Sequence, residues 1–151
     1  MYTIRPANKL NTEEISQILL LWKTSVRATH HFLPEKMVIA LRPLVHEAFL
    51  AIEHLLVLVD EYGHIQGFSG IEGDRLEMLF LAPDHFKQGL GKMLILHAIS
   101  CFDIQYVDVN EQNPDATQFY QHIGFEIIGR SETDGQGNPF PILHLKLTKP
   151  L

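Results

Sequence analysis

Several features that would mark a particular class of protein are scarce in this sequence of 151 residues. It has a single cysteine, Cys101, so no disulfide can form within the chain, as is typical of proteins in a reducing compartment. The longest apolar runs, such as residues 55–59, are too short to cross a bilayer, and the first ten residues contain no secretory apolar segment. We therefore expect a cytoplasmic protein without a membrane partner.

An excess of positive charge is also missing. Twelve lysine and arginine residues against 18 aspartate and glutamate residues give a net charge of −6. Because nucleic-acid binding requires a basic surface, we expect no nucleic-acid partner. A negative surface does tolerate a cationic acceptor such as an amine.

Common nucleotide and metal motifs are absent as well. No Gly-Lys-Ser or Gly-Lys-Thr is present to form a Walker A loop, and Gly89-Leu90-Gly91 lacks the third glycine, at Leu94, of a dinucleotide-binding motif. The nine histidines form neither His-Glu-x-x-His nor a Cys/His cluster, so we expect no metal. Cys101 falls on an apolar helical stripe, where we expect a buried and unreactive thiol.

What the sequence does contain predicts one α/β domain, residues 1–151, with about six to seven strands and about four helices. A strand at 2–5 precedes a helix capped by Asn11 and a second helical region, 35–54, which Pro43 kinks or divides. Strands at 55–60, 65–71 and 75–81 are typical of an antiparallel meander. A helix from Leu90, a strand at 105–110, a helix from Asn113 to Gly124 and strands at 125–130 and 143–147 follow. This order predicts a mixed sheet with a parallel step in its second half.

A glycine-containing turn between a strand and a helix is the most informative segment. Gly89 and Gly91 open the helix after the strand that ends at Pro83. Free N–H groups at a helix N-terminus attract phosphate, and glycine allows a close approach of backbone to ligand. The segment indicates a pyrophosphate site, although glycines that serve only packing remain an equal alternative.

Two longer motifs carry a resemblance to a known family. Residues 79–84, Leu-Phe-Leu-Ala-Pro-Asp, followed by Gln88-Gly89-Leu90-Gly91-Lys92, resemble motif A of the GCN5-related N-acetyltransferase (GNAT) superfamily. Residues 109–113, Val-Asn-Glu-Gln-Asn, with Ala116, Phe119-Tyr120 and Gly124-Phe125, resemble its motif B. Residues 28–33 and 129–132 are similar to a bacterial YjaB-like branch. The order of elements matches the superfamily along essentially the whole chain, which implies a mostly antiparallel sheet with splayed strands.

The resemblance implies acetyl-CoA as cosubstrate, held by the turn and the neighbouring strands. The implied contacts are Leu79, Phe80, Leu81, Phe86, Lys87, Gln88, Gly89, Leu90, Gly91, Lys92, Asn110, Asn113 and Tyr120. One position departs from the family pattern, because Phe86 stands where an arginine or glutamine is usual. Polar contacts to phosphate would then come from Lys87, Gln88, Lys92 and the backbone N–H groups. Asn113 has a competing role as a helix cap, which we favour.

The resemblance also implies a mechanism. A bulge near residues 79–81 would splay this strand from the strand at 107–110, an amine would attack the thioester directly, and a backbone N–H near Leu79 would bind the oxyanion. Tyr120 would protonate the leaving thiolate, the alternative being a tyrosine of the core.

Two residues are candidates for the base that deprotonates the amine. Glu77 lies two residues before Leu79, so strand alternation predicts the same face for both. His30 lies in the segment where acceptors enter this fold, and histidine titrates near neutral pH. Either could equally be a structural residue.

The acceptor is not defined by the sequence, and could be a small-molecule amine or an amine of a protein. Either a monomer or a homodimer is compatible with the sequence. The runner-up function is a catalytically weak CoA-binding sensor or interaction module of the same fold, which the departure at Phe86 motivates.

Overall fold

Seven strands form a single mixed sheet in the computed structural model, which describes residues 1–83 and 89–149. Their order across the sheet is β1-β2-β3-β4-β5-β7-β6. Only the β4–β5 pair is parallel among the neighbouring pairs of the described residues. The predicted mixed, mostly antiparallel sheet with one parallel step is confirmed. The strands are β1 (Thr3–Pro6), β2 (His54–Val59), β3 (Ile65–Glu72), β4 (Arg75–Leu81), β5 (Tyr106–Asn110), β6 (Phe125–Ser131) and β7 (Ile142–Leu147).

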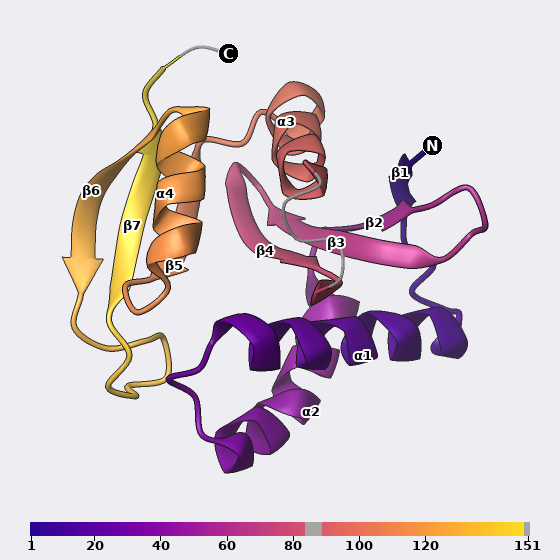
Figure 1. Ribbon diagram of the computed structural model, residues 1–151, viewed down its shortest axis with the longest axis horizontal. Helices are drawn as coiled ribbons and strands as arrows, with labels where there is room; N and C mark the ends of the chain where they lie inside the picture. Colours follow the sequence, from indigo (N-terminus) through magenta and orange to yellow (C-terminus); the bar gives the residue numbers. More distant parts are fainter. Residues whose placement is uncertain (84–88, 150–151) are drawn as a thin grey trace.

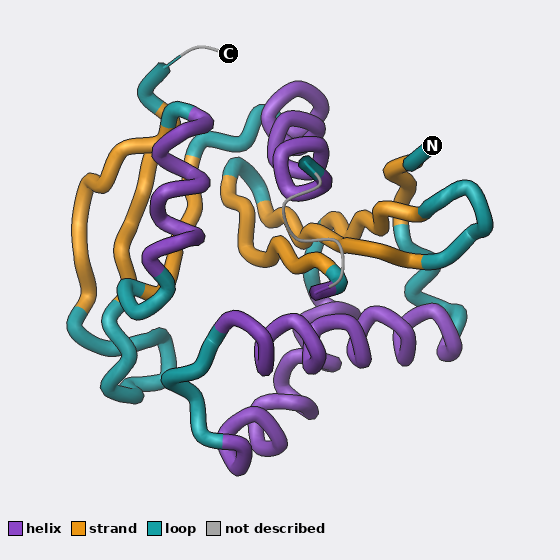
Figure 2. The backbone as a smooth tube through the Cα atoms, viewed as in Figure 1, coloured by secondary structure: helices purple, strands orange, loops and turns teal. Residues whose placement is uncertain are grey.

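Helices cover both faces of this sheet, as Figures 1 and 2 show. Helices α1 (Thr12–Thr29) and α2 (Glu35–Ala51) lie on one face, where Ile18 and Phe49 pack against Phe68 of β3. Helices α3 (Leu90–Phe102) and α4 (Pro114–Ile123) lie on the other face, where their apolar side chains form a second cluster with β5 and β7. No helix in the described ranges is long and apolar enough to cross a membrane.

Side-chain caps fix where α1 and α4 begin. The Asn11 side chain accepts hydrogen bonds from the N–H groups of Glu13 and Glu14, as its position predicts. Asn113 accepts from the N–H of Ala116 at 3.3 Å, and Gly124 ends α4 with a φ of 127°. The caps therefore fix the two ends of α4 between β5 and β6.

The expected division of α2 at Pro43 and its expected end at residue 54 are both wrong, whereas a kink at Pro43 stays a prediction. Pro43 lies inside one continuous helix and does not divide it, and the helix ends at Ala51 because residue 54 already belongs to β2. Pro43 and Ile39, which lies one helical turn before it, are both exposed. The carbonyl group that loses its intrahelical partner at a proline can thus bond to water, which makes the proline tolerable.

Candidate active site

Strands β4 and β5 form a fork, and the fork creates the cavity of interest. Among the described residues, the two strands pair in parallel only at Arg75–Tyr106 and Leu76–Val107. Beyond Leu76 they diverge, and a cavity of about 160 Å³ lies between them. The residues that line it are His30, Leu76, Glu77, Met78, Leu79, Phe80, Val107, Asp108, Val109, Asn110, Asn113, Ala116 and Tyr120. The expected splaying of these strands is confirmed.

The bulge lies earlier in β4 than the sequence predicted. Gly70 of β3 pairs with Met78, and Ile71 pairs with Leu76, so Glu77 is the extra residue of a β-bulge. The prediction placed the bulge at residues 79–81, where the pairing with β3 is in fact regular. A bulge bends a strand and increases its twist, so a bulge at Glu77 accounts for the divergence that starts after Leu76.

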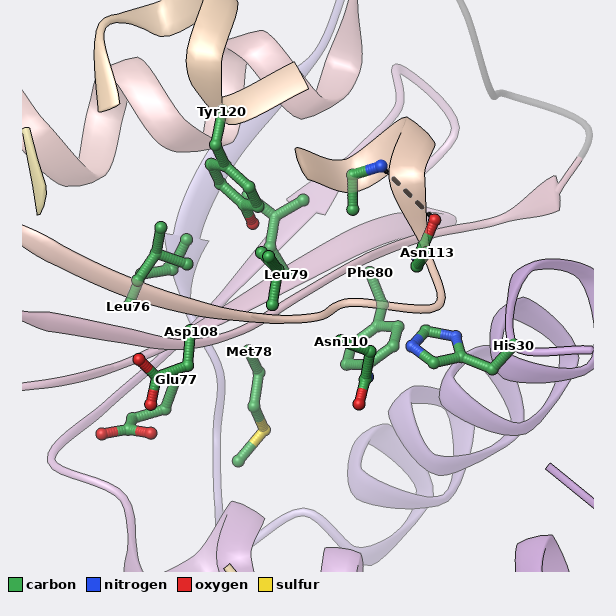
Figure 3. Close-up of a pocket in the computed structure, with 13 residues that line it drawn as sticks. His30, Leu76, Glu77, Met78, Leu79, Phe80, Asp108, Asn110, Asn113 and Tyr120 are labelled. Atoms are coloured by element: carbon green, nitrogen blue, oxygen red, sulfur yellow. Dashed lines mark hydrogen bonds between the residues drawn. The ribbon is translucent and has the colours of Figure 1, made fainter. Parts of the chain in front are cut away.

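The bulge also changes which side chains share a face. Leu76 and Leu79 both pack towards α3 and α4, while Met78 packs towards α1 and α2. Glu77 points to the side of Met78, away from Leu79 (Figure 3). The expectation that Glu77 shares the face of Leu79 is therefore wrong, because strict alternation along a strand does not hold across a bulge.

Tyr120 enters the cavity from α4, on the side of Leu79 (Figure 3). Its side chain is 6% exposed and packs edge-on against Phe119 and Phe125, with ring centroids 5.0 and 5.7 Å apart. Burial raises the pKa of the Tyr120 phenol above its usual range. The hydroxyl group therefore stays protonated at neutral pH and can donate a hydrogen bond into the cavity.

His30 approaches the cavity from the opposite side, at the end of α1 (Figure 3). Burial, with a smaller contribution from the nearby His31, lowers the pKa of His30 to about 4, so the ring is neutral at pH 7. The Thr29 hydroxyl donates to the carbonyl of Ser25 at 2.8 Å, so its oxygen accepts from Nδ1 of His30 at 2.7 Å. Nε2 of His30 is thus left as a hydrogen-bond acceptor.

A charged cluster at the base of the fork was not predicted from the sequence. Asp108 lines the cavity beside Glu77 (Figure 3). Arg75 contacts both carboxylates, and His144 contacts Asp108. Strand alternation within Tyr106–Asn110 places Asp108 opposite to the buried Val107 and Val109, and this signal could have identified it.

The predicted cofactor residues divide into three groups. Leu79, Phe80, Asn110, Asn113 and Tyr120 line the cavity. Leu81 and the start of α3 lie outside its lining, with Gly89 as N-cap at a φ of 78°. Within α3, Leu90 and Gly91 are buried and Lys92 is exposed. Phe86, Lys87 and Gln88 lie outside the described residues.

Gly91 has a packing role, which was one of the two alternatives for the glycines of this turn. A Cβ atom at Gly91 would lie 3.4 Å from Cζ of Phe119 and 3.5 Å from Cδ1 of Leu81. The small residue lets α3 pack closely on α4 and β4, so the packing interpretation of this glycine holds. Gly89 differs, because no atom lies within 4 Å of a Cβ there and its positive φ is what favours glycine.

The part of the chain that the structure describes indicates neither a metal centre nor a thiol nucleophile. No group of three or more His, Cys, Asp or Glu side chains that could hold a metal ion occurs in residues 1–83 and 89–149. Cys101 is exposed, which contradicts the expected burial, because it lies on the outer side of α3. It is also outside the cavity lining.

Comparisons with known proteins agree with this geometry. A family model described as an acetyltransferase (GNAT) domain matches residues 51–127. Peptidyl-lysine N-acetyltransferase YjaB of Salmonella typhimurium is 40% identical over 133 residues, which are 88% of this chain and 91% of that protein. Peptidyl-lysine N-acetyltransferase YiaC of Escherichia coli is 34% identical over 116 residues, which are 76% of this chain and 79% of that protein.

Solved structures share the fold along nearly the whole chain. The solution structure of apo-form YjaB from Escherichia coli has a TM-score of 0.89 at 35% identity, covering 99% of both chains. The crystal structure of PaiA N-acetyltransferase from Thermoplasma acidophilum, in complex with coenzyme A, has a TM-score of 0.74 at 21% identity, covering 97% of this chain and 99% of that one.

Proposed function

Because this chain belongs to the GNAT acetyltransferase family, we propose that it transfers the acetyl group of acetyl-CoA to the side-chain amine of a lysine in a protein or peptide. The observation that carries the proposal is the β4–β5 fork, with the Tyr120 hydroxyl on one side and the Glu77 carboxylate on the other. The lysine acceptor is supported by the activity named for YjaB and YiaC.

The fork suits the elongated cosubstrate. Beyond Leu76, β4 has no ladder partner from β5 in the described residues, so its backbone groups on that side are free to pair with amide groups of a ligand. Acetyl-CoA supplies an acyl group activated as a thioester. Leu79, Asn110 and Asn113 would hold its arm, and the N-terminus of α3 would face its phosphates.

Tyr120 acts as the general acid in this proposal. Its buried phenol remains protonated at neutral pH, which supports donation of a proton to the thiolate that leaves. Tyr120 lines the cavity, whereas a tyrosine enclosed entirely by the core would not.

Glu77 acts as the base, and His30 orients the amine. A carboxylate attracts the ammonium form of lysine, and because Glu77 is 44% exposed it can pass the proton on to water. His30 is neutral and presents Nε2 as an acceptor, which suits a hydrogen bond to the amine. Both lie away from Tyr120, so acid and base act from opposite sides of the fork.

A cytoplasmic location is part of the same proposal. It is supported by the single cysteine, which can form no disulfide within the chain.

An acceptor comparison tests the proposed function. The release of CoA from acetyl-CoA would be measured with three acceptors: a lysine peptide with a blocked N-terminus, the same peptide with arginine in place of lysine and a free N-terminus, and a polyamine. We expect the highest kcat/KM with the lysine peptide. Preference for either other acceptor would reject the lysine assignment, and binding of acetyl-CoA without any turnover would favour a sensor.

A further inference from the structure

Arg75 lies between two carboxylates at the base of the fork. Its Nη2 is 3.0 Å from Oδ2 of Asp108, whereas its Nε is 3.6 Å from Oε1 of Glu77. The first distance is that of a hydrogen-bonded ion pair, and the second is longer than any hydrogen bond. Arg75 therefore binds Asp108 closely and contacts Glu77 only loosely.

Neighbouring side chains hold Arg75 and Asp108 in this arrangement. The guanidinium of Arg75 lies over the ring of Tyr106, 5.6 Å from its centroid. The other oxygen of Asp108, Oδ1, is 2.8 Å from Nδ1 of His144. Nε2 of His144 is in turn 2.7 Å from the hydroxyl of Ser131. Both oxygens of Asp108 thus have a donor.

The direction of these hydrogen bonds follows from their chemistry. An ionised carboxylate only accepts, so Nδ1 of His144 carries the hydrogen that it shares with Asp108. In neutral His144, Nε2 then accepts from the Ser131 hydroxyl. The chain of bonds runs from β6 through β7 to β5, three neighbouring strands, which gives Asp108 a fixed position.

We propose that Asp108, held in place by His144, keeps Arg75 from pairing with Glu77 and so leaves the Glu77 carboxylate available to the acceptor amine. Asp108 and His144 are positioning residues in this arrangement. The inference rests on the proposed function, because it takes Glu77 as the base.

The consequence of losing Asp108 follows from the geometry. Without that carboxylate, the nearest charged partner of Arg75 is Glu77, on the same strand. A guanidinium binds a carboxylate through two parallel hydrogen bonds, which would occupy both oxygens of Glu77. Glu77 would then be poorly placed to attract an ammonium group or to accept its proton.

A serine hydrolase site is a different interpretation of the same three residues, because Ser131, His144 and Asp108 follow the order of its catalytic triad. In this protein Asp108, at one end of the series of hydrogen bonds, lines the cavity, whereas Ser131 and His144 do not. Ser131 is therefore not placed to act as a nucleophile in the cavity, whereas Asp108 is placed to affect Arg75 and Glu77.

Four variants test the inference by steady-state acetylation of the lysine peptide: Glu77→Gln, Asp108→Asn, the double variant Asp108→Asn/Arg75→Gln, and Arg130→Gln. The last is a matched control, since Arg130 forms an ion pair of similar exposure with Glu111 outside the cavity lining. We expect Asp108→Asn to lower kcat about tenfold, part of what a general base contributes. The KM for acetyl-CoA should not change, and the double variant should recover most of the lost kcat. The control should match the wild type.

His144 supplies a second comparison, which also serves if Asp108→Asn does not fold. His144→Ala loses the donor to Asp108 and should lower kcat, whereas His144→Asn keeps an N–H donor near the position of Nδ1 and should restore it. A residue that merely stabilised the sheet would change the unfolding midpoint of both variants without this difference in kcat.

The outcomes separate the two claims. Full activity of Glu77→Gln would reject Glu77 as the base, and the inference with it. An absence of acetylation of the lysine peptide by the wild type would reject the proposed function itself. A slow Glu77→Gln variant together with a fully active Asp108→Asn variant would overturn the inference alone. A double variant Asp108→Asn/Arg75→Gln with a kcat as low as that of Asp108→Asn would also overturn the inference.

Discussion

The chemistry of Tyr120 is set by the side chains that surround it. A tyrosine on an apolar helical stripe is ordinarily part of the core, and Tyr120 is as buried as a core residue. Tyr120 differs from a residue enclosed entirely by the core in that it lines the cavity between β4 and β5. Sequence periodicity predicted the burial, and only the similarity to motif B pointed to a reactive role.

Replacing Tyr120 by phenylalanine isolates that role. The variant keeps the ring packing against Phe119 and Phe125 but lacks the proton donor. We expect kcat to fall about 10²-fold, the lower range for general acid catalysis, while the dissociation constant for acetyl-CoA stays the same. Stopped-flow or steady-state turnover and calorimetric titration provide the two values. Unchanged turnover would contradict a catalytic role and leave Tyr120 as a structural residue of the core.

Burial makes His30 sensitive to acid. Its pKa is about 4 in the folded chain against 6.5 as the ordinary value, so the unfolded chain binds a proton more readily. A lowered pKa contributes stability that is present above pH 6.5 and is lost as the pH falls towards 4.

A His30→Gln variant lacks this titration. We expect the free energy of unfolding of the wild type to fall more steeply than that of the variant between about pH 7 and pH 5. Urea unfolding at pH 7 and pH 5 measures the free energy of unfolding of each protein. The contributions of the other eight histidines are the same in both proteins and cancel in the comparison. Parallel pH dependence in both would contradict the buried, neutral state of His30.

At the scale of elements, strand β4 shows where sequence patterns succeed and where they fail. Its bounds, Arg75–Leu81, agree with the prediction. The bulge at Glu77 could not be predicted, because it depends on how β4 pairs with Gly70 and Ile71 of β3. Residues 78–81 are all apolar, so no alternation in the strand itself signals the change of face.

Helix α4 offers an element-scale prediction through its cap. Asn113 lines the cavity and also accepts a hydrogen bond from Ala116, so its two suggested roles can be separated. We expect Asn113→Ala to lower the free energy of unfolding by about 1 kcal/mol and Asn113→Ser to retain most of it. Chemical denaturation measures both. If Asn113→Ser keeps stability but loses affinity for acetyl-CoA, the asparagine contacts the ligand as well. Wild-type stability of Asn113→Ala would reject the cap as a source of stability.

For the whole molecule, the order of elements was the most predictable property. Caps at Asn11 and Asn113 and the alternation of strands and helices gave the sequence of elements along the chain. The relations between distant segments were beyond local patterns. Arg75, Asp108 and His144 come together only because β4, β5 and β7 are neighbours in the sheet. Alternation in β5 could have marked Asp108 as a residue that faces away from the core, but its contacts with Arg75 and His144 could not be predicted from the sequence.

The central claim is that the fork between β4 and β5 binds acetyl-CoA. The most direct test is calorimetric titration of the purified protein with acetyl-CoA, with free CoA for comparison. We predict micromolar binding with one ligand per chain, because the open backbone edge of β4 and the N-terminus of α3 provide donors that do not depend on side chains. An absence of binding up to millimolar acetyl-CoA would contradict the assignment of the fork as the cosubstrate site.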